Sequence, residues 1–288
     1  MDDTASPLML RRRLRTELRA ARLRRGLTQE QVARAMEWSL SKMNRIEKAK
    51  SGISVNDLKV LLPYYGITDE ERTDELVDLA RAARQTPWWR RRYSDVAPPE
   101  LLDLIDYESA ATAVSQFETM FVPGILQTED YASAILQVFY DEKSAPEKVA
   151  AMVKLRTTRR DLLTSDNAPK FSFMLDESVI HRLVGIPSIT SQQLEHLVNV
   201  AKLPNVTVRV VPFSAGLHPG MKGPFEVVEF DDTPDENIVF VEEQSGIFIS
   251  EDSSETDSYL EAFRRIAEKS LSPSDSVSRL LKAADEVA

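Results

Sequence analysis

The chain has 288 residues, of which 42% are hydrophobic and 28% charged, values typical of a soluble globular protein with room for two domains. It contains no cysteine, which excludes disulfides and thiolate metal sites. No apolar run approaches the length of about 18 residues that a membrane span needs. The acidic N-terminus lacks the apolar segment of a signal peptide, so we expect a cytoplasmic protein.

The net charge of −10 is divided unevenly along the chain. Residues 1–66 hold 14 Lys and Arg against 7 Asp and Glu, whereas the remainder holds 22 against 39. Such asymmetry suggests a basic nucleic-acid-binding domain attached to an acidic one. Because the acidic part would repel a duplex, we expect the N-terminal domain to make the contact with nucleic acid.

The first expected helix covers residues 8–25 and ends at Gly26. Its buried stripe has helical spacing and consists of Leu10, Leu14, Leu18 and Ala21. Its arginines form a dense cationic surface made of Arg11, Arg12, Arg13, Arg15, Arg19, Arg22, Arg24 and Arg25. We expect some of them, including Arg12, to contact DNA phosphates, which gives affinity without sequence information.

Residues 28–48 predict two short helices joined by a tight turn. Thr28 is a good N-cap for the first helix, and Gln31 completes a capping box. Ser39 can cap the second helix, which is expected to end near residue 48. The turn includes Glu37, where a left-handed backbone would cost about 1 kcal/mol.

The second of these helices carries the functional prediction. Met43 and Ile46 lie on one side and are expected to face the core. The opposite side has no carboxylate and carries Ser41, Asn44, Arg45 and Lys48. In a major groove, Arg pairs with guanine and Asn with adenine. Since a solvated helix face normally mixes both signs of charge, DNA binding is favoured over a merely solvated surface.

The run L-T-Q-E-Q-V-A at 27–33 and the run S-K-M-N-R-I-E at 41–47 resemble the lambda-repressor/Cro (XRE) type of helix-turn-helix domain. The resemblance implies that Gln29 contacts a phosphate and braces the recognition helix. It also implies that the residues meeting DNA are Leu40, Ser41, Lys42, Asn44 and Arg45. Two positions that are commonly Gly in the family are Glu37 and Ala49 here.

Beyond the N-terminal domain, the pattern mixes helices with strands. Residues 85–100 have the composition of a linker. Helices are expected at 101–116, from 128 onward, and at 146–164, 178–184, 190–203, 255–271 and 274–287. Strands are expected at 170–175, 206–211, 225–230, 238–242 and 247–250, and residues 117–122 are apolar and partly alternating. The predicted fold is therefore α+β. An all-helical domain (8–84) and the linker precede a small mixed sheet covered by helices (101–272) and a C-terminal helix (273–288).

Several short runs in order give the C-terminal domain its own resemblance. They are V-P-G-I-L-Q-T-E-D-Y-A at 122–132, L-D-E at 175–177, P-N-V-T-V at 204–208 and P-F-S-A-G at 212–216. Together they resemble the DUF5753-type domain found behind XRE domains in filamentous actinomycetes. The resemblance implies an antitoxin-like transcriptional regulator, often paired with a small partner protein.

No pattern in the chain predicts an enzyme. The three histidines, His181, His196 and His218, form no H-E-x-x-H motif, and neither G-x-S-x-G nor a Walker loop is present. We therefore expect no catalysis, cofactor or metal. Two roles stay open for the C-terminal domain. In the first, the domain docks a small protein. In the second, it binds an acidic small molecule near the 213–224 loop, through Arg156, Arg159, Arg160 and His218.

These observations predict a sequence-specific transcriptional regulator that binds double-stranded DNA. We expect it to bind as a homodimer, because helix-turn-helix domains of this type usually act in pairs. The alternative is an antitoxin-like interaction scaffold that binds a small protein without specific DNA binding. A mobility shift with genomic fragments separates the two.

Overall fold

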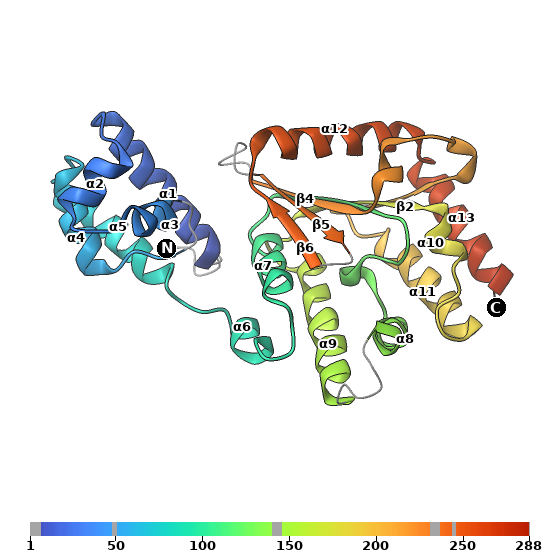
Figure 1. The fold of residues 1–288 in the computed structure, drawn as a ribbon. Helices are drawn as coiled ribbons and strands as arrows, with labels where there is room; N and C mark the ends of the chain where they lie inside the picture. Colours follow the sequence, from blue (N-terminus) through green and yellow to red (C-terminus); the bar gives the residue numbers. More distant parts are fainter. Residues whose placement is uncertain (1–6, 48–50, 140–145, 231–236, 244–245, 288) are drawn as a thin grey trace. The chain divides into compact units, whose positions relative to one another are not determined.

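The structure is a computed structural model that describes residues 7–47, 51–139, 146–230, 237–243 and 246–287. It divides into two compact units, Met1–Arg91 and Arg92–Ala288, which we call the head and the body (Figure 1). Each is described on its own below. Lys48, predicted to contact DNA, lies outside the described residues.

The head is helical throughout. Its main helices are α1 (Pro7–Arg24), α2 (Gln29–Ala35), α3 (Leu40–Glu47), α4 (Val55–Tyr64) and α5 (Glu70–Ala82). The predicted Thr28 cap forms, since its side chain accepts from the third backbone N–H of α2, and Ser54 caps α4 in the same way. One hydrophobic core joins all five helices, through side chains such as Leu18, Val32, Met43, Leu62 and Leu76. The capping box of Thr28 and Gln31 is present as predicted.

Two stretches between residues 85 and 118 differ in secondary structure from the expectation. The expected linker at 85–100 contains the short helix α6 (Trp88–Tyr93) and the start of α7 (Pro99–Glu108). The helix expected at 101–116 ends at Glu108, and residues 113–118 form the strand β1 (Ala113–Glu118). The middle four residues of β1 are buried on both faces, so the strand lacks the alternation that identifies a half-exposed strand.

The body is built on one six-stranded mixed sheet in the order β3-β2-β1-β4-β5-β6. Strands β1, β2 (Lys170–Asp176) and β3 (Val206–Val211) are parallel. Strands β4 (Phe225–Glu229), β5 (Ile238–Glu243) and β6 (Gly246–Ser250) extend it antiparallel. The expected small mixed sheet covered by helices is thus confirmed.

Helices lie on both faces of this sheet (Figure 1). Helix α12 (Ser253–Lys269) packs on β1, β3, β4 and β5, where Phe263 and Ile266 meet Phe117 and Val227. Figure 1 shows α7, α8 (Glu129–Phe139) and α9 (Pro146–Arg159) on the opposite side. The remaining helices are α10 (Glu177–His181), α11 (Pro187–Val200) and α13 (Pro273–Val287), and α13 packs on α11 and β3. Among the described residues, no helix has the length and apolarity that crossing a bilayer requires.

Candidate nucleic-acid interface

Helix α3 presents a polar ridge to solvent. Met43 and Ile46 are 1% and 5% exposed and pack into the head core, as their spacing predicts. The opposite side of the helix leaves Ser41, Asn44 and Arg45 exposed. We call these three residues the polar ridge. Its amide and guanidinium match base edges in a major groove, and it carries no carboxylate.

The turn between α2 and α3 is a Schellman motif with a glutamate at the left-handed position. Glu37 has φ 55°, and it is the one non-glycine residue with positive φ in the described part of the chain. The N–H of Trp38 donates to the carbonyl of Ala33, and the N–H of Glu37 to that of Arg34. These two bonds close the end of α2 in the usual Schellman pattern. The turn therefore forms with glutamate at this position, at a cost in backbone strain.

A buried ion pair fixes α3 against the rest of the head. Arg22 donates from Nε to Glu47 Oε1 at 2.5 Å and from Nη2 to Oε2 at 3.0 Å. Both residues are under 9% exposed. The hydrogen bond to Glu47 and its charge raise the pKa of Arg22, against the opposing effect of burial. The pair joins α1 to the last residue of α3, so the ridge is held at a defined angle.

Gln29 completes this network from the start of α2. Its Nε2 donates to Glu47 Oε2 at 2.6 Å. The family resemblance implies that Gln29 braces α3, and this hydrogen bond to Glu47, the last residue of α3, is such a contact. Its implied phosphate contact stays a prediction.

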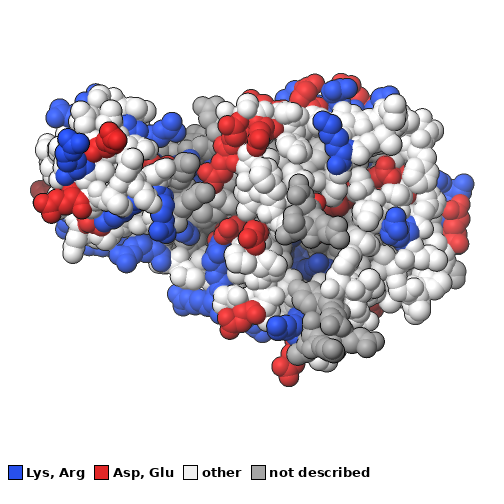
Figure 2. Space-filling model, in the orientation of Figure 1, with Lys and Arg blue, Asp and Glu red and all other residues white. Residues whose placement is uncertain are grey.

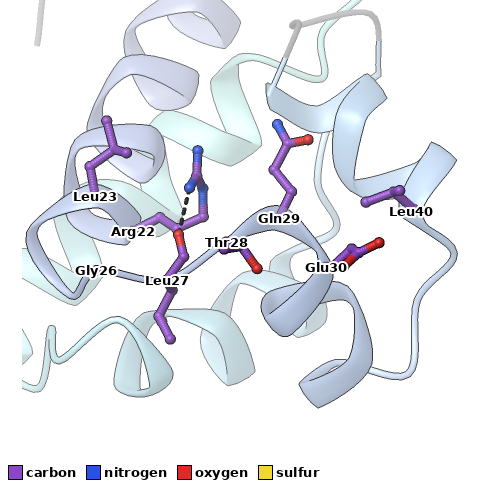
Figure 3. Close-up of a pocket in the computed structure, with 8 residues that line it drawn as sticks. All are labelled: Arg22, Leu23, Gly26, Leu27, Thr28, Gln29, Glu30 and Leu40. Atoms are coloured by element: carbon purple, nitrogen blue, oxygen red, sulfur yellow. Dashed lines mark hydrogen bonds between the residues drawn. The ribbon is translucent and has the colours of Figure 1, made fainter.

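A surface hollow lies beside the ridge, where the end of α1, the start of α2 and the first residue of α3 meet (Figure 3). Gln29 and Leu40, two of the residues predicted to meet DNA, both line it. Figure 3 shows Arg22 turned toward the carbonyl of Leu27, to which its Nη1 donates at 2.6 Å. Leu40 is 47% exposed, so an apolar side chain stands at the rim. A polar-and-apolar rim of this kind suits contact with sugar and base-methyl groups.

Lys42 is held by the protein itself. Its Nζ lies 3.0 Å from Asp57 Oδ2 at the start of α4 and 4.1 Å from the centroid of the Trp38 ring. Burial works to raise the pKa of Asp57, but hydrogen bonds from Lys42 and Ser54 outweigh it and the pKa is lowered. A DNA contact by Lys42 would compete with these partners.

The cationic surface of α1 differs from the expectation at two positions. Arg12 and Arg22 are only 5% and 8% exposed, because the buried side of α1 extends past the leucine stripe. Arg12 is thus buried and not on the cationic surface where it was expected, and its phosphate contact stays a prediction. Figure 2 shows Lys and Arg side chains spread over the visible face of the head. The exposed arginines of α1 are Arg13, Arg19 and Arg24.

The candidate ligand residues of the body do not form one site. Arg159 makes a buried, two-point ion pair with Glu108. Arg156 donates to Gln127 Oε1 at 2.8 Å, and Arg160 is half-buried in the helical turn after α9. His218 instead lies beyond β3, with Nε2 3.7 Å from Asp176 Oδ2. Because Glu108 already neutralises Arg159, this arginine is not free to bind the expected acidic ligand.

Comparison with protein-family models agrees with this division. A model described as a helix-turn-helix domain matches residues 13–76. Together with the exposed polar ridge, the match defines the chain as a helix-turn-helix DNA-binding regulator. A second model, described as a domain of unknown function (DUF5753), matches residues 101–282. The chain therefore belongs to the DUF5753 family, with a helix-turn-helix domain ahead of it. Searches of curated proteins and of solved structures gave no match.

Proposed function

We propose that the protein is a sequence-specific transcriptional regulator without catalytic activity, in which Asn44 and Arg45 read base edges and Ser41 assists. The observation that carries the proposal is the exposed polar ridge held by the buried Arg22–Glu47 pair. Arg and Asn are the side chains that pair best with guanine and adenine edges. A rigidly placed helix is what base-specific contact requires, since each contact depends on geometry.

The exposed arginines of α1 supply the affinity that does not depend on sequence. Arg13, Arg19 and Arg24 are accessible, and guanidinium groups bind phosphate through several hydrogen bonds. We infer further that the protein acts as a homodimer, which places two ridges about 34 Å apart on a palindromic site. The body is then the part that senses a ligand or a small partner protein.

The proposal is tested by selecting bound sequences from sheared genomic DNA with the full-length protein. We expect enrichment of a two-fold symmetric site whose halves lie one helical turn apart. A specific band in a mobility shift and a dimer mass by light scattering should accompany it. Enrichment of no sequence, together with co-purification of a small protein, would favour the antitoxin-like scaffold. The observation in favour of the scaffold is Glu37, which has positive φ at a position that is commonly Gly in the XRE family.

A further inference from the structure

The two outer strands of the body sheet end it in different ways. The outer strand β3 has backbone partners beyond the sheet, since the N–H of Val210 donates to Ser276 Oγ at 3.0 Å and its carbonyl accepts from the N–H of Leu271 at 2.8 Å. Helix α13 also packs against β3. The other outer strand is β6 (Figure 1). Among the described residues, its backbone groups have no partner outside β5, so one row of N–H and C=O groups is left unpaired.

Strand β6 also lacks the features that usually keep an outer strand from pairing. Its sequence, G-I-F-I-S, contains neither a charged residue nor a proline. Phe248 is 49% exposed, and Ile247 and Ile249 are half-buried. An apolar outer strand with an unpaired backbone is suited to adding a further strand.

The helices of the body leave apolar side chains of β6 accessible on both faces of the sheet. Phe248 is in register with Val241 of β5, which packs in the hydrophobic core under α12, so Phe248 lies on the α12 face. Helix α12 packs on β1, β3, β4 and β5, and the ring of Phe248 stays half-exposed beyond it. Ile247 and Ile249 lie on the opposite face, where α7 contacts β6 without burying them fully. A strand placed beside β6 would cover both sets of side chains.

We propose that β6 pairs in antiparallel fashion with β6 of a second copy of the chain, which joins the two body sheets across a two-fold axis at Phe248. This inference deepens the homodimer part of the proposed function by naming the surface that forms the dimer. It rests on the proposed function only for the role of the dimer on DNA, because the pairing itself needs no DNA.

The sequence of β6 complements itself. When the pair is centred on Phe248, the middle residue of the strand, all five residues have partners: Phe248 faces Phe248, Ile247 faces Ile249 and Gly246 faces Ser250. Each copy then contributes the same residues, as a two-fold interface requires. Pairs of aromatic and of β-branched side chains stabilise adjacent strands, and within β6 no charge opposes a like charge.

The antiparallel direction also keeps the acidic residues after β6 apart. Glu251 accepts a hydrogen bond from the hydroxyl of Tyr107 at 3.4 Å, and Asp252 caps α12. With the axis at Phe248, the two copies of Glu251 lie six residue steps apart, about 20 Å. That separation exceeds the screening length of about 8 Å at physiological salt. A parallel pair would place the same carboxylates side by side, so the charges favour the two-fold arrangement, which is also the symmetry of a palindromic DNA site.

A single cysteine tests the axis directly, because the chain has no cysteine of its own. In Phe248→Cys, the two thiols meet across the axis, where the Cα separation of directly opposed residues suits a disulfide. We expect mild oxidation of the full-length protein to link it rapidly into dimers. Leu217→Cys, at an 84% exposed position between β3 and β4, is the control for linkage by random collision and should react much more slowly. Equal rates for the two variants would overturn the proposal.

Opposed charges test the same position without oxidation. Phe248→Lys and Phe248→Glu each place like charges across the axis and should weaken dimerisation about tenfold or more. An equimolar mixture of the two should recover the dimer, because Lys then faces Glu. Sedimentation velocity over a range of micromolar concentrations measures all three samples. Leu217→Lys is the matched control and should behave as the wild type. Unfolding curves report whether each variant is folded.

Three results would contradict the assignment of β6. They are a wild-type chain that stays monomeric at tens of micromolar, a Phe248→Lys chain that dimerises as the wild type does, and a mixture that recovers no dimer. The second result would leave the proposed homodimer intact but place its interface elsewhere. A mobility shift on the same samples reports DNA binding separately. A dimer linked through β6 that selects no DNA sequence would count against the proposed function and not against the interface.

Discussion

Arg22 in α1 and Glu47 at the end of α3 form a buried two-point ion pair across 25 residues of sequence. The pair, with Gln29, adds a polar connection between α3 and helices α1 and α2, which also share the hydrophobic core of the head. Removing one partner leaves the other charge buried and unpaired, which is more damaging than removing both.

The first prediction follows from this asymmetry. Glu47→Met should lower the free energy of unfolding of the head by about 3–5 kcal/mol, whereas the double variant Arg22→Met/Glu47→Met should recover much of that loss. Denaturant unfolding followed through Trp38, which packs against the head core, measures both. A double variant less stable than Glu47→Met would show that the pair contributes more than the cost of its burial.

A second prediction concerns the turn at Glu37. Glu37→Gly should stabilise the head by about 1 kcal/mol, because glycine adopts positive φ without the steric cost that a Cβ brings. Ala35→Gly, two residues earlier at the last position of α2, is the control and should destabilise by up to about 1 kcal/mol. If Glu37→Gly is neutral or destabilising, the side chain of Glu37 contributes more than the strain it causes.

The arginines of α1 give the third prediction. Arg24→Ala should weaken binding to all DNA sequences similarly and reduce the slope of log affinity against log salt by about 1. Arg24 is exposed and follows Leu23, which lines the hollow beside the ridge. Arg12→Ala should instead lower the stability of the head, since Arg12 is buried. Fluorescence anisotropy across a salt series, with Arg81→Ala as the exposed control, distinguishes these effects. A loss confined to one operator would contradict a phosphate role for Arg24.

The fourth prediction is a pH dependence of the body. With its pKa raised to about 8, folded Glu118 keeps its proton at pH values where the unfolded chain has lost it. The free energy of unfolding should therefore fall as the pH rises from about 4.5 to 8. Glu118→Gln removes this penalty and should stabilise the body by about 2–3 kcal/mol at pH 7. The gain should shrink as the pH approaches 4.5. An equal gain at pH 5 and pH 8 would mean that Glu118 does not titrate in this range.

Local sequence signals predicted much of the head. The capping box of Thr28 and Gln31 forms as predicted because its hydrogen bonds depend on only a few neighbouring residues. The apolar spacing of Met43 and Ile46 likewise fixed which side of α3 is exposed. Arg12 was misplaced because the width of the buried side of α1 is decided by contacts with other helices.

Signals in the body depend more on distant residues. The strand β1 was predicted as the end of a helix because Ser115 and Gln116 are polar yet buried, and no alternation shows. Gln116, Glu226 and Phe240 lie side by side on one face of the sheet but come from three different strands. The Arg159–Glu108 pair likewise joins two helices distant in sequence. No local pattern predicts the ion pair between Glu108 and Arg159. The arginines at 156, 159 and 160 therefore suggested an acidic ligand.

The most direct test of the account is the affinity of Arg45→Ala for the selected operator and for single-base variants of it. We expect affinity to fall by about 1–3 kcal/mol and discrimination at one base pair of each half-site to disappear, with the other positions unchanged. If Arg45→Ala binds the operator as tightly and as selectively as the wild type, the polar ridge does not read DNA and the proposed function is wrong.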